Sequence, residues 1–105
     1  MPEHVAYTST GMLIVEATEP VPGLHVYEIP TQYDARHRWM LAHHEGHALA
    51  AFDTDAAATE AAGVLAPLAD WTRSVMTAAN EISLNGRTDL LRALMAAAGG
   101  HQPNG

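Results

Sequence analysis

The sequence predicts an α+β domain, in which an antiparallel β-meander of four to five strands precedes two to three helices packed on one face of the sheet. The first half alternates β-rich runs with glycine and proline turns, a pattern typical of neighbouring antiparallel strands. The second half is rich in alanine and places apolar residues at helical spacing. Neither half has enough large apolar side chains for a core of its own, so we expect the helices to cover the sheet.

The predicted strands are separated by residues that favour tight turns. Thr10 and Gly11 suit a two-residue hairpin connection between the first two strands. Pro22 and Gly23 fit the central positions of a type II turn, where glycine supplies the positive φ angle. We therefore expect strands at residues 4–9, 12–18, 24–29, 36–44 and 47–53.

The stretch "AHHEGHAL", residues 42–49, at first resembles the helix of an HExxH zinc protease. His43 and His47 have the required spacing, but Glu45 follows His43 by two positions instead of one. Starting from His44 puts the glutamate in its correct place, yet the second histidine is then replaced by Ala48. The motif fails in both registers, so we interpret the stretch as a hairpin turn.

Taking Glu45 and Gly46 as the two turn residues fixes which side chains share a face, because side chains alternate along a strand. One face is then formed by Trp39, Leu41, His43, Ala48, Ala50 and Phe52. The other face is formed by Met40, Ala42, His44, His47, Leu49 and Ala51. This register predicts that Trp39 lies directly opposite Phe52, and an aromatic cross-strand pair is a stabilising contact.

The same register makes His44 and His47 cross-strand neighbours, which could hold a metal ion together. His25 or His37 would be the candidates for a third ligand. A structural zinc site normally closes with four ligands, so exposed histidines at a hairpin tip are the simpler interpretation. The sequence gives no reason to expect a cofactor.

Helix signals begin after the last predicted strand. Thr54 is a good N-cap for a first helix, and Pro67 should end or kink that helix. Asp70 can cap a second helix over residues 71–82, and a third is opened by Thr88 or Asn85. We expect one domain over residues 1–98 and a disordered tail over residues 99–105.

The charge balance limits the classes of partner. Twelve acidic residues against five basic ones, all arginine, give a formal net charge of −7, which disfavours direct binding to nucleic acid. Cysteine is absent, which excludes disulfides and thiolate chemistry. The N-terminal residues do not resemble a signal peptide, and no apolar run is long enough to span a membrane, so we expect a cytoplasmic protein.

Acidic side chains gather where the first helix is predicted to begin. Asp53, Asp55 and Glu60 could form a patch that docks on a basic protein surface, although dipole complementarity and solvation explain them more simply. No serine or threonine has the histidine and acid signature of a nucleophilic triad. We therefore expect that the protein is not an enzyme.

Residues 38–72 resemble small uncharacterised proteins of GC-rich bacteria, their phages and mobile elements. The shared pattern is a tryptophan-bearing strand, a turn with glycine, "A-x-F-x-T", an alanine-rich helix and "ADWT". The motif is structural, and the resemblance carries no site residues. It implies an accessory or regulatory binding role.

Three functions compete on these observations. The first is a protein-binding regulator or inhibitor, which we prefer. The second is a metal-binding protein that uses His44 and His47, and the third binds a small ligand between sheet and helices, near Tyr27 or Trp71. Because large core residues are few, a homodimer would also help to stabilise the chain.

Overall fold

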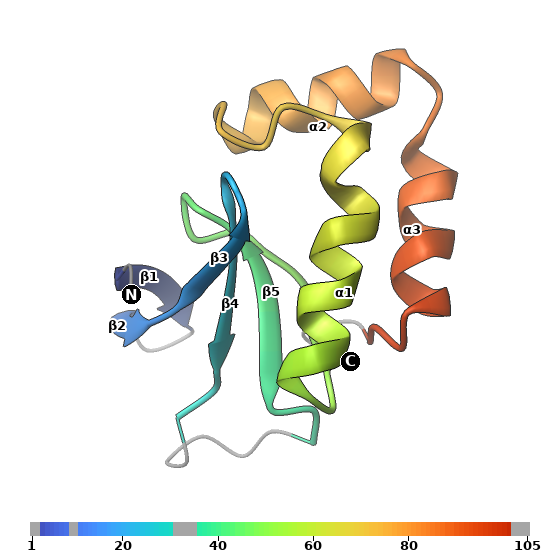
Figure 1. Cartoon of the computed structure of the whole chain (residues 1–105). Helices are drawn as coiled ribbons and strands as arrows, with labels where there is room; N and C mark the ends of the chain where they lie inside the picture. The colour runs from blue at the N-terminus through green and yellow to red at the C-terminus, as the bar shows by residue number, and fades with distance from the viewer. Residues whose placement is uncertain (1–2, 9–10, 31–35, 102–105) are drawn as a thin grey trace.

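The computed structural model of the chain describes residues 3–8, 11–30 and 36–101 (Figure 1). It confirms an α+β fold of antiparallel strands followed by helices that pack against the sheet. The strands are β1 Glu3–Thr8, β2 Gly11–Glu16, β3 Thr18–Val21, β4 Leu24–Glu28, β5 Trp39–His43 and β6 Ala48–Phe52. The helices are α1 Asp55–Leu65, the short 3₁₀ helix η1 Ala66–Leu68, α2 Val75–Leu84 and α3 Thr88–Ala97.

Strands β1 and β2 form a two-stranded hairpin that is separate from the main sheet. Thr8 pairs with Gly11, so the connection consists of residues 9 and 10, which lie outside the described residues. The predicted connection at Thr10 and Gly11 is therefore shifted by one residue, because Gly11 already belongs to the second strand.

The main sheet has the antiparallel strand order β3-β4-β5-β6. A strand at β3 was not predicted, because Pro20 lies within it, and an edge strand is where a sheet tolerates proline. The turn at Pro22 and Gly23 follows as expected, with Gly23 at φ +90°. A Cβ atom at Gly23 would lie 2.1 Å from the carbonyl oxygen of Trp71, so the close packing there also requires glycine.

The β5–β6 hairpin confirms the predicted pair of Trp39 and Phe52. Farther along, the register shifts, because Leu41 faces Ala50 whereas Ala42 faces Ala48. Leu49 is the extra residue of this bulge. The prediction was therefore wrong for two positions: Ala48 packs with the face of Ala42, and Leu49 packs with the face of Leu41.

The shift also changes the turn. The His43 N–H donates to the His47 carbonyl (2.8 Å), so His43 and not His44 lies opposite His47. Residues 44–46 form a three-residue loop, in which the Gly46 N–H donates to the His43 carbonyl (2.9 Å) and Gly46 takes φ +102°. A three-residue loop with glycine in this conformation matches the strand twist, and it replaces the predicted two-residue turn.

The first helix begins and ends as the sequence predicts. The Thr54 hydroxyl accepts a hydrogen bond from the Ala57 N–H (3.1 Å), which caps α1. The helix ends at Leu65, and Pro67 lies in the short 3₁₀ helix that follows. Because proline lacks an N–H, it closes the α-helix at this position.

The second helix begins later than predicted. Asp70 does not cap a helix, because its carboxylate accepts from the Thr72 N–H (3.1 Å) and from Arg73 (3.3 Å) within a local turn. The cap is instead Ser74, whose hydroxyl accepts from the Thr77 N–H (3.2 Å). Residues 71–74 are thus a connection that leads into α2.

The chain continues to contact the sheet beyond the end of α3. Residues 99 to 101 return to β6, where His101 and Ala51 exchange two backbone hydrogen bonds of 2.8 and 2.9 Å. The predicted tail therefore begins with an ordered segment, and its residues 102–105 lie outside the described part of the chain.

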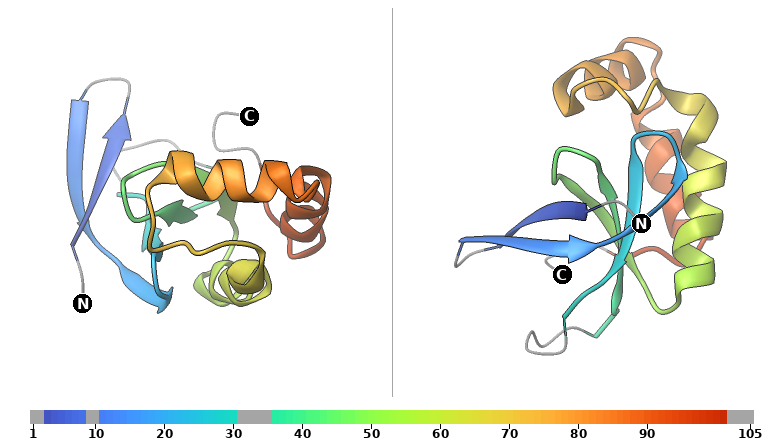
Figure 2. Two further views of the ribbon diagram at one scale, coloured as in Figure 1. Left: turned by 90° about the horizontal axis from the view of Figure 1, so that it is seen from above. Right: turned by 60° about the vertical axis from the view of Figure 1, so that its left-hand side comes forward.

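Two hydrophobic cores lie on opposite faces of the four-stranded sheet. The larger core is formed with α1 and its neighbouring helices and includes Leu24, Val26, Leu41, Phe52, Leu65, Trp71 and Ile82. The smaller core is formed with the β1–β2 hairpin and includes Ala6, Ala17, Tyr27, Met40, Ala42 and Ala51. Figure 2 shows the resulting layers, with the hairpin on one side of the sheet and α1 and α3 on the other. None of the described helices is long and apolar enough to cross a membrane.

Candidate functional site

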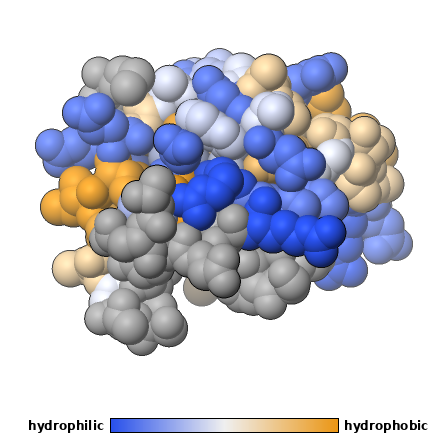
Figure 3. Space-filling model, turned by 90° about the horizontal axis from the view of Figure 1, so that it is seen from below, coloured by the Kyte–Doolittle hydropathy of each residue, from blue (hydrophilic) through white to orange (hydrophobic). Residues whose placement is uncertain are grey.

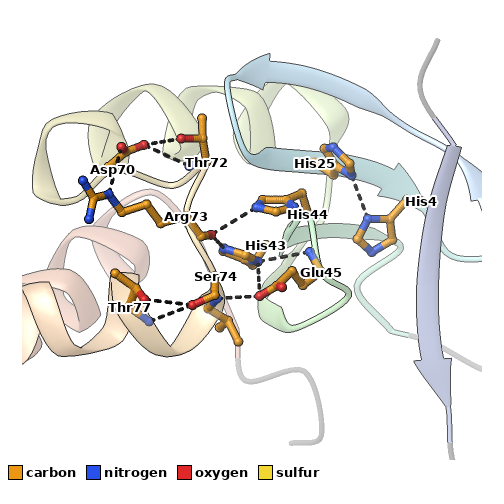
Figure 4. Close-up of polar contacts among 11 residues, drawn as sticks. His4, His25, His43, His44, Glu45, Asp70, Thr72, Arg73, Ser74 and Thr77 are labelled. Atoms are coloured by element: carbon orange, nitrogen blue, oxygen red, sulfur yellow. Dashed lines mark hydrogen bonds and ion pairs between the residues drawn. The ribbon is translucent and has the colours of Figure 1, made fainter.

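The turn at residues 43–46 forms hydrogen bonds with the connection at residues 71–74 and with the start of α2 (Figure 4). The His43 side chain is fully buried. Its Nδ1 accepts from the Glu45 N–H (3.1 Å), so the proton of the neutral ring is on Nε2, which donates to the Arg73 carbonyl (2.8 Å). Burial lowers the pKa of His43. This histidine is therefore a neutral structural residue with both nitrogens engaged.

The two residues after His43 strengthen the same contact. His44 packs its ring against that of His43 at 4.2 Å and places Nε2 3.1 Å from the Arg73 carbonyl. The Glu45 carboxylate accepts a hydrogen bond from the Val75 N–H (2.6 Å) at the first residue of α2. A negative charge at a helix N-terminus is stabilising. The turn thus fixes the position of α2.

The predicted metal pair of His44 and His47 is not supported by a third ligand in the described residues. His47 is exposed, and Nε2 of His44 is already directed at a carbonyl. Within the described part of the chain, neither histidine belongs to a group of three potential ligands. His25 and His37, the two candidates for a third ligand, lie in other clusters.

A second histidine cluster joins the β1–β2 hairpin to the main sheet. His25 Nε2 lies 3.2 Å from the Glu19 carboxylate, which can only accept, so His25 donates there. With both rings neutral, His25 Nδ1 then accepts from His4 Nδ1 at 2.8 Å. His4 Nε2 is left as a buried nitrogen without a hydrogen-bond partner.

The environment of His4 keeps its imidazole neutral. Burial is the largest cause that lowers the pKa of His4 to about 4, and Coulomb repulsion between His4 and the neighbouring His25 and His44, when these are protonated, acts in the same direction. The ring stacks on Tyr27, with the ring centres 4.9 Å apart. Glu19 also accepts from the Gly23 N–H (3.1 Å), and this bond lowers the pKa of the Glu19 carboxyl.

A shallow groove of about 460 Å³ lies between these two histidine clusters. It is lined by Glu19, Pro22, Gly23, His25, His44 and Thr72. Its polar groups are largely engaged, since the Thr72 hydroxyl donates to Asp70 (2.5 Å) and both nitrogens of His25 have partners. The groove therefore offers no activated nucleophile among the residues that line it.

The predicted acidic residues Asp53, Asp55 and Glu60 are all exposed. The Asp53 carboxylate lies 2.5 Å from His37 Nδ1, and this hydrogen bond lowers the pKa of Asp53. Asp55 accepts from the Thr59 hydroxyl (3.3 Å). The patch thus exists on the surface, but one of its three charges is already paired with a histidine.

The prediction missed an apolar surface on the outer face of the β1–β2 hairpin. Met12 is 71% exposed and Ile14 is 65% exposed, whereas Leu13 and Val15 turn toward the sheet. Figure 3 shows an apolar area on the side of the molecule where Figure 1 places this hairpin. The unbroken apolar run at residues 12–15 was the signal, because alternate side chains of a strand cannot all face one core.

The structure also brings together three potential metal ligands that lie far apart in the sequence. His37, Asp53 and His101 each place a ligand atom within 4.8 Å of the other two.

No protein-family model matches the chain, and no curated protein or solved structure shows significant similarity to it. The resemblance of residues 38–72 to small proteins of phages and mobile elements therefore stays a prediction.

Proposed function

We propose that the chain is a small binding protein, a regulator or inhibitor, that contacts a protein partner through the outer face of its β1–β2 hairpin. We call this surface the hairpin face; it consists of Glu3, Val5, Met12, Ile14 and Glu16. The exposure of two adjacent large apolar side chains on this face carries the proposal.

Single exposed apolar residues are common, but this arrangement is more specific. Met12 and Ile14 lie two residues apart on one strand, and Val5 pairs with Ile14 across the hairpin. Burying two such side chains in a partner would contribute roughly 3 kcal/mol. Each hairpin strand also has an edge without a strand partner in the described residues, where a partner's backbone could pair.

The charges around the hairpin face favour a basic partner. Glu3 and Glu16 pair across one end of the hairpin, and both side chains are exposed. With a formal net charge of −7, the chain repels a second copy of itself and attracts a basic protein. We therefore propose a partner that presents an apolar groove with basic residues on its rim, and we rank a homodimer below it.

The alternative of a small ligand between sheet and helices receives little support. Tyr27 is buried on the hairpin side of the sheet, and Trp71 is buried on the helix side. The Trp71 Nε1–H donates to the Leu65 carbonyl (2.9 Å), which satisfies its polar atom within the core. Both side chains are core residues.

The test compares substitutions on the hairpin face with substitutions of equally exposed residues elsewhere. After photo-crosslinking from position 14 in the native host has identified a partner, its affinity is measured for wild type and for the Met12→Thr/Ile14→Thr variant. The control variant is Met76→Gln/Leu84→Gln, because these α2 residues are 72% and 86% exposed. We expect the hairpin variant to bind at least about tenfold more weakly, a loss of about 1.4 kcal/mol, and the control to bind normally.

Two results would contradict this proposal. One is equal binding by wild type and the hairpin variant. The other is a wild-type dimer in light scattering that dissociates in the hairpin variant, since the hairpin face would then be a self-association surface.

A further inference from the structure

We propose that His37, Asp53 and His101 form a binding site for one divalent transition-metal ion, such as Zn²⁺ or Ni²⁺, which fastens the segment after α3 to the sheet. We call these residues the ligand trio. The site is independent of the proposed function, because no residue of the hairpin face belongs to it.

The fold itself delivers the three ligands to one place. Trp39 pairs with Phe52, so His37 and Asp53, which flank these strand ends, lie at the same end of the β5–β6 hairpin. Their side chains meet, with His37 Nδ1 2.5 Å from an Asp53 carboxylate oxygen. His101 arrives from the far end of the described chain, held by its two backbone hydrogen bonds to Ala51.

Two glycines let the last segment approach the sheet closely. Gly99 takes φ +93°, and the Gly100 N–H donates to the Met95 carbonyl (2.8 Å). A Cβ atom at Gly100 would lie 2.8 Å from that carbonyl oxygen and 3.1 Å from the Phe52 ring. A larger residue would push the segment away, so the backbone of His101 is placed before any ion binds.

The chemistry of the ligand trio suits a transition metal. Two imidazoles and a carboxylate are ligands that zinc and its neighbours prefer, and three protein ligands leave a position open for water or a further ligand. His37 Nδ1 and an Asp53 oxygen share a hydrogen bond of 2.5 Å, so an ion that takes both as ligands replaces the proton between them. Arg36 lies near enough to oppose a cation, but the chain as a whole carries a formal charge of −7.

One movement is needed for loading. The rings of His37 and His101 stack with centres 3.6 Å apart and planes within 1° of parallel. A metal ion lies in the plane of each imidazole that binds it, so two parallel rings at this spacing cannot share an ion. His101, whose side chain is exposed, turns about its own side-chain bonds while its backbone stays paired.

The first experiment measures binding of the metal ion alone to the full chain, prepared without a histidine tag. Calorimetric titration with Zn²⁺ and with Ni²⁺ should show one ion per chain with micromolar or tighter affinity. His101→Gln, His37→Gln and Asp53→Asn should each weaken this binding at least roughly tenfold, because three ligands are few enough for each to matter. The matched control is His44→Gln/His47→Gln, which should bind as wild type does.

Spectroscopy then locates the ion independently of affinity. Co²⁺ in place of Zn²⁺ should give visible absorption bands that the His101→Gln variant lacks. Backbone amide shifts on adding Zn²⁺ should concentrate at residues 37, 53 and 101. Should His37→Gln fail to fold, His101→Gln decides, because its side chain is exposed near the end of the described chain.

Three results would overturn the site. The first is wild-type protein that binds neither ion at micromolar concentration. The second is binding that survives His101→Gln. The third is binding that is lost in the His44→Gln/His47→Gln control, which would restore the hairpin-tip pair as the metal site.

Discussion

Acidification from about pH 7.5 to pH 5 should destabilise the protein by about 2 kcal/mol through His4 alone. The folded pKa of His4 is about 4, against 6.5 for an exposed histidine. Below pH 6.5 the unfolded chain therefore binds a proton that the folded chain rejects. Stability falls as the pH drops through this range; the loss reaches about 3 kcal/mol at pH 4 and is complete only below the folded pKa.

The structural cause is the buried, unpartnered Nε2 of His4. A proton there would place a charge beside His25 and near His44, with the ring of Tyr27 stacked over it. Glu19 is the nearby carboxylate, but it is hydrogen-bonded to His25. Nothing in this immediate set compensates a charge on His4, so protonation should loosen the contact between the β1–β2 hairpin and the main sheet.

The assay is urea unfolding of wild type and His4→Phe at four pH values between about 5 and 7.5. Phenylalanine keeps a ring against Tyr27 but cannot titrate. The difference in unfolding free energy between the two proteins should change by about 2 kcal/mol over this range in favour of the variant at low pH. His43 also has a lowered pKa, but it is present in both proteins, so the subtraction removes its contribution.

A control variant and a clear negative outcome complete the test. His47→Gln removes an exposed histidine, and its stability should follow the wild-type pH dependence. If His4→Phe and wild type lose stability in parallel as the pH falls, then His4 does not titrate as its burial requires, and the reasoning is refuted.

Three further predictions are checked by chemical denaturation, and two of them test contacts of the connection between α1 and α2. Gly23→Ala should destabilise the protein by more than about 2 kcal/mol, because the added Cβ meets the backbone of Trp71. Gly63→Ala should stabilise it by about 0.5–1 kcal/mol, because the space around Gly63 in α1 is open. Ser74→Ala should cost about 1 kcal/mol, because the Thr77 N–H loses its capping partner. An unchanged unfolding free energy in Gly23→Ala would contradict the close packing against the Trp71 backbone. The same result in Ser74→Ala would contradict the capping hydrogen bond to the Thr77 N–H.

Local sequence signals were sufficient where the relevant contact is local or symmetric. Thr54 capped a helix because its hydroxyl needs only an N–H three residues away. Trp39 and Phe52 were paired correctly because the bulge at Leu49 restores the register that the longer loop shifts by one residue. The predicted loop was one residue too short, since glycine at position 46 suits a two-residue and a three-residue loop equally well.

Long-range contacts explain why the start of α2 was misplaced. Asp70 and Ser74 are both good N-caps, and nothing near them in the sequence decides between them. The start of α2 is fixed by the 43–46 turn, where His43 donates a hydrogen bond to the Arg73 carbonyl and Glu45 accepts one from the Val75 N–H. The partner of each contact lies 30 residues away, beyond the reach of local pattern analysis.

The same distinction separates the two metal hypotheses. His44 and His47 lie three positions apart, so an unfolded chain can present them together, whereas the ligand trio exists only when the sheet and the last segment are folded. An ion that binds folded and unfolded chains alike does not stabilise the fold, whereas one that requires the fold does. Zinc should therefore raise the melting temperature of wild type and of His44→Gln/His47→Gln, and it should leave that of His101→Gln unchanged.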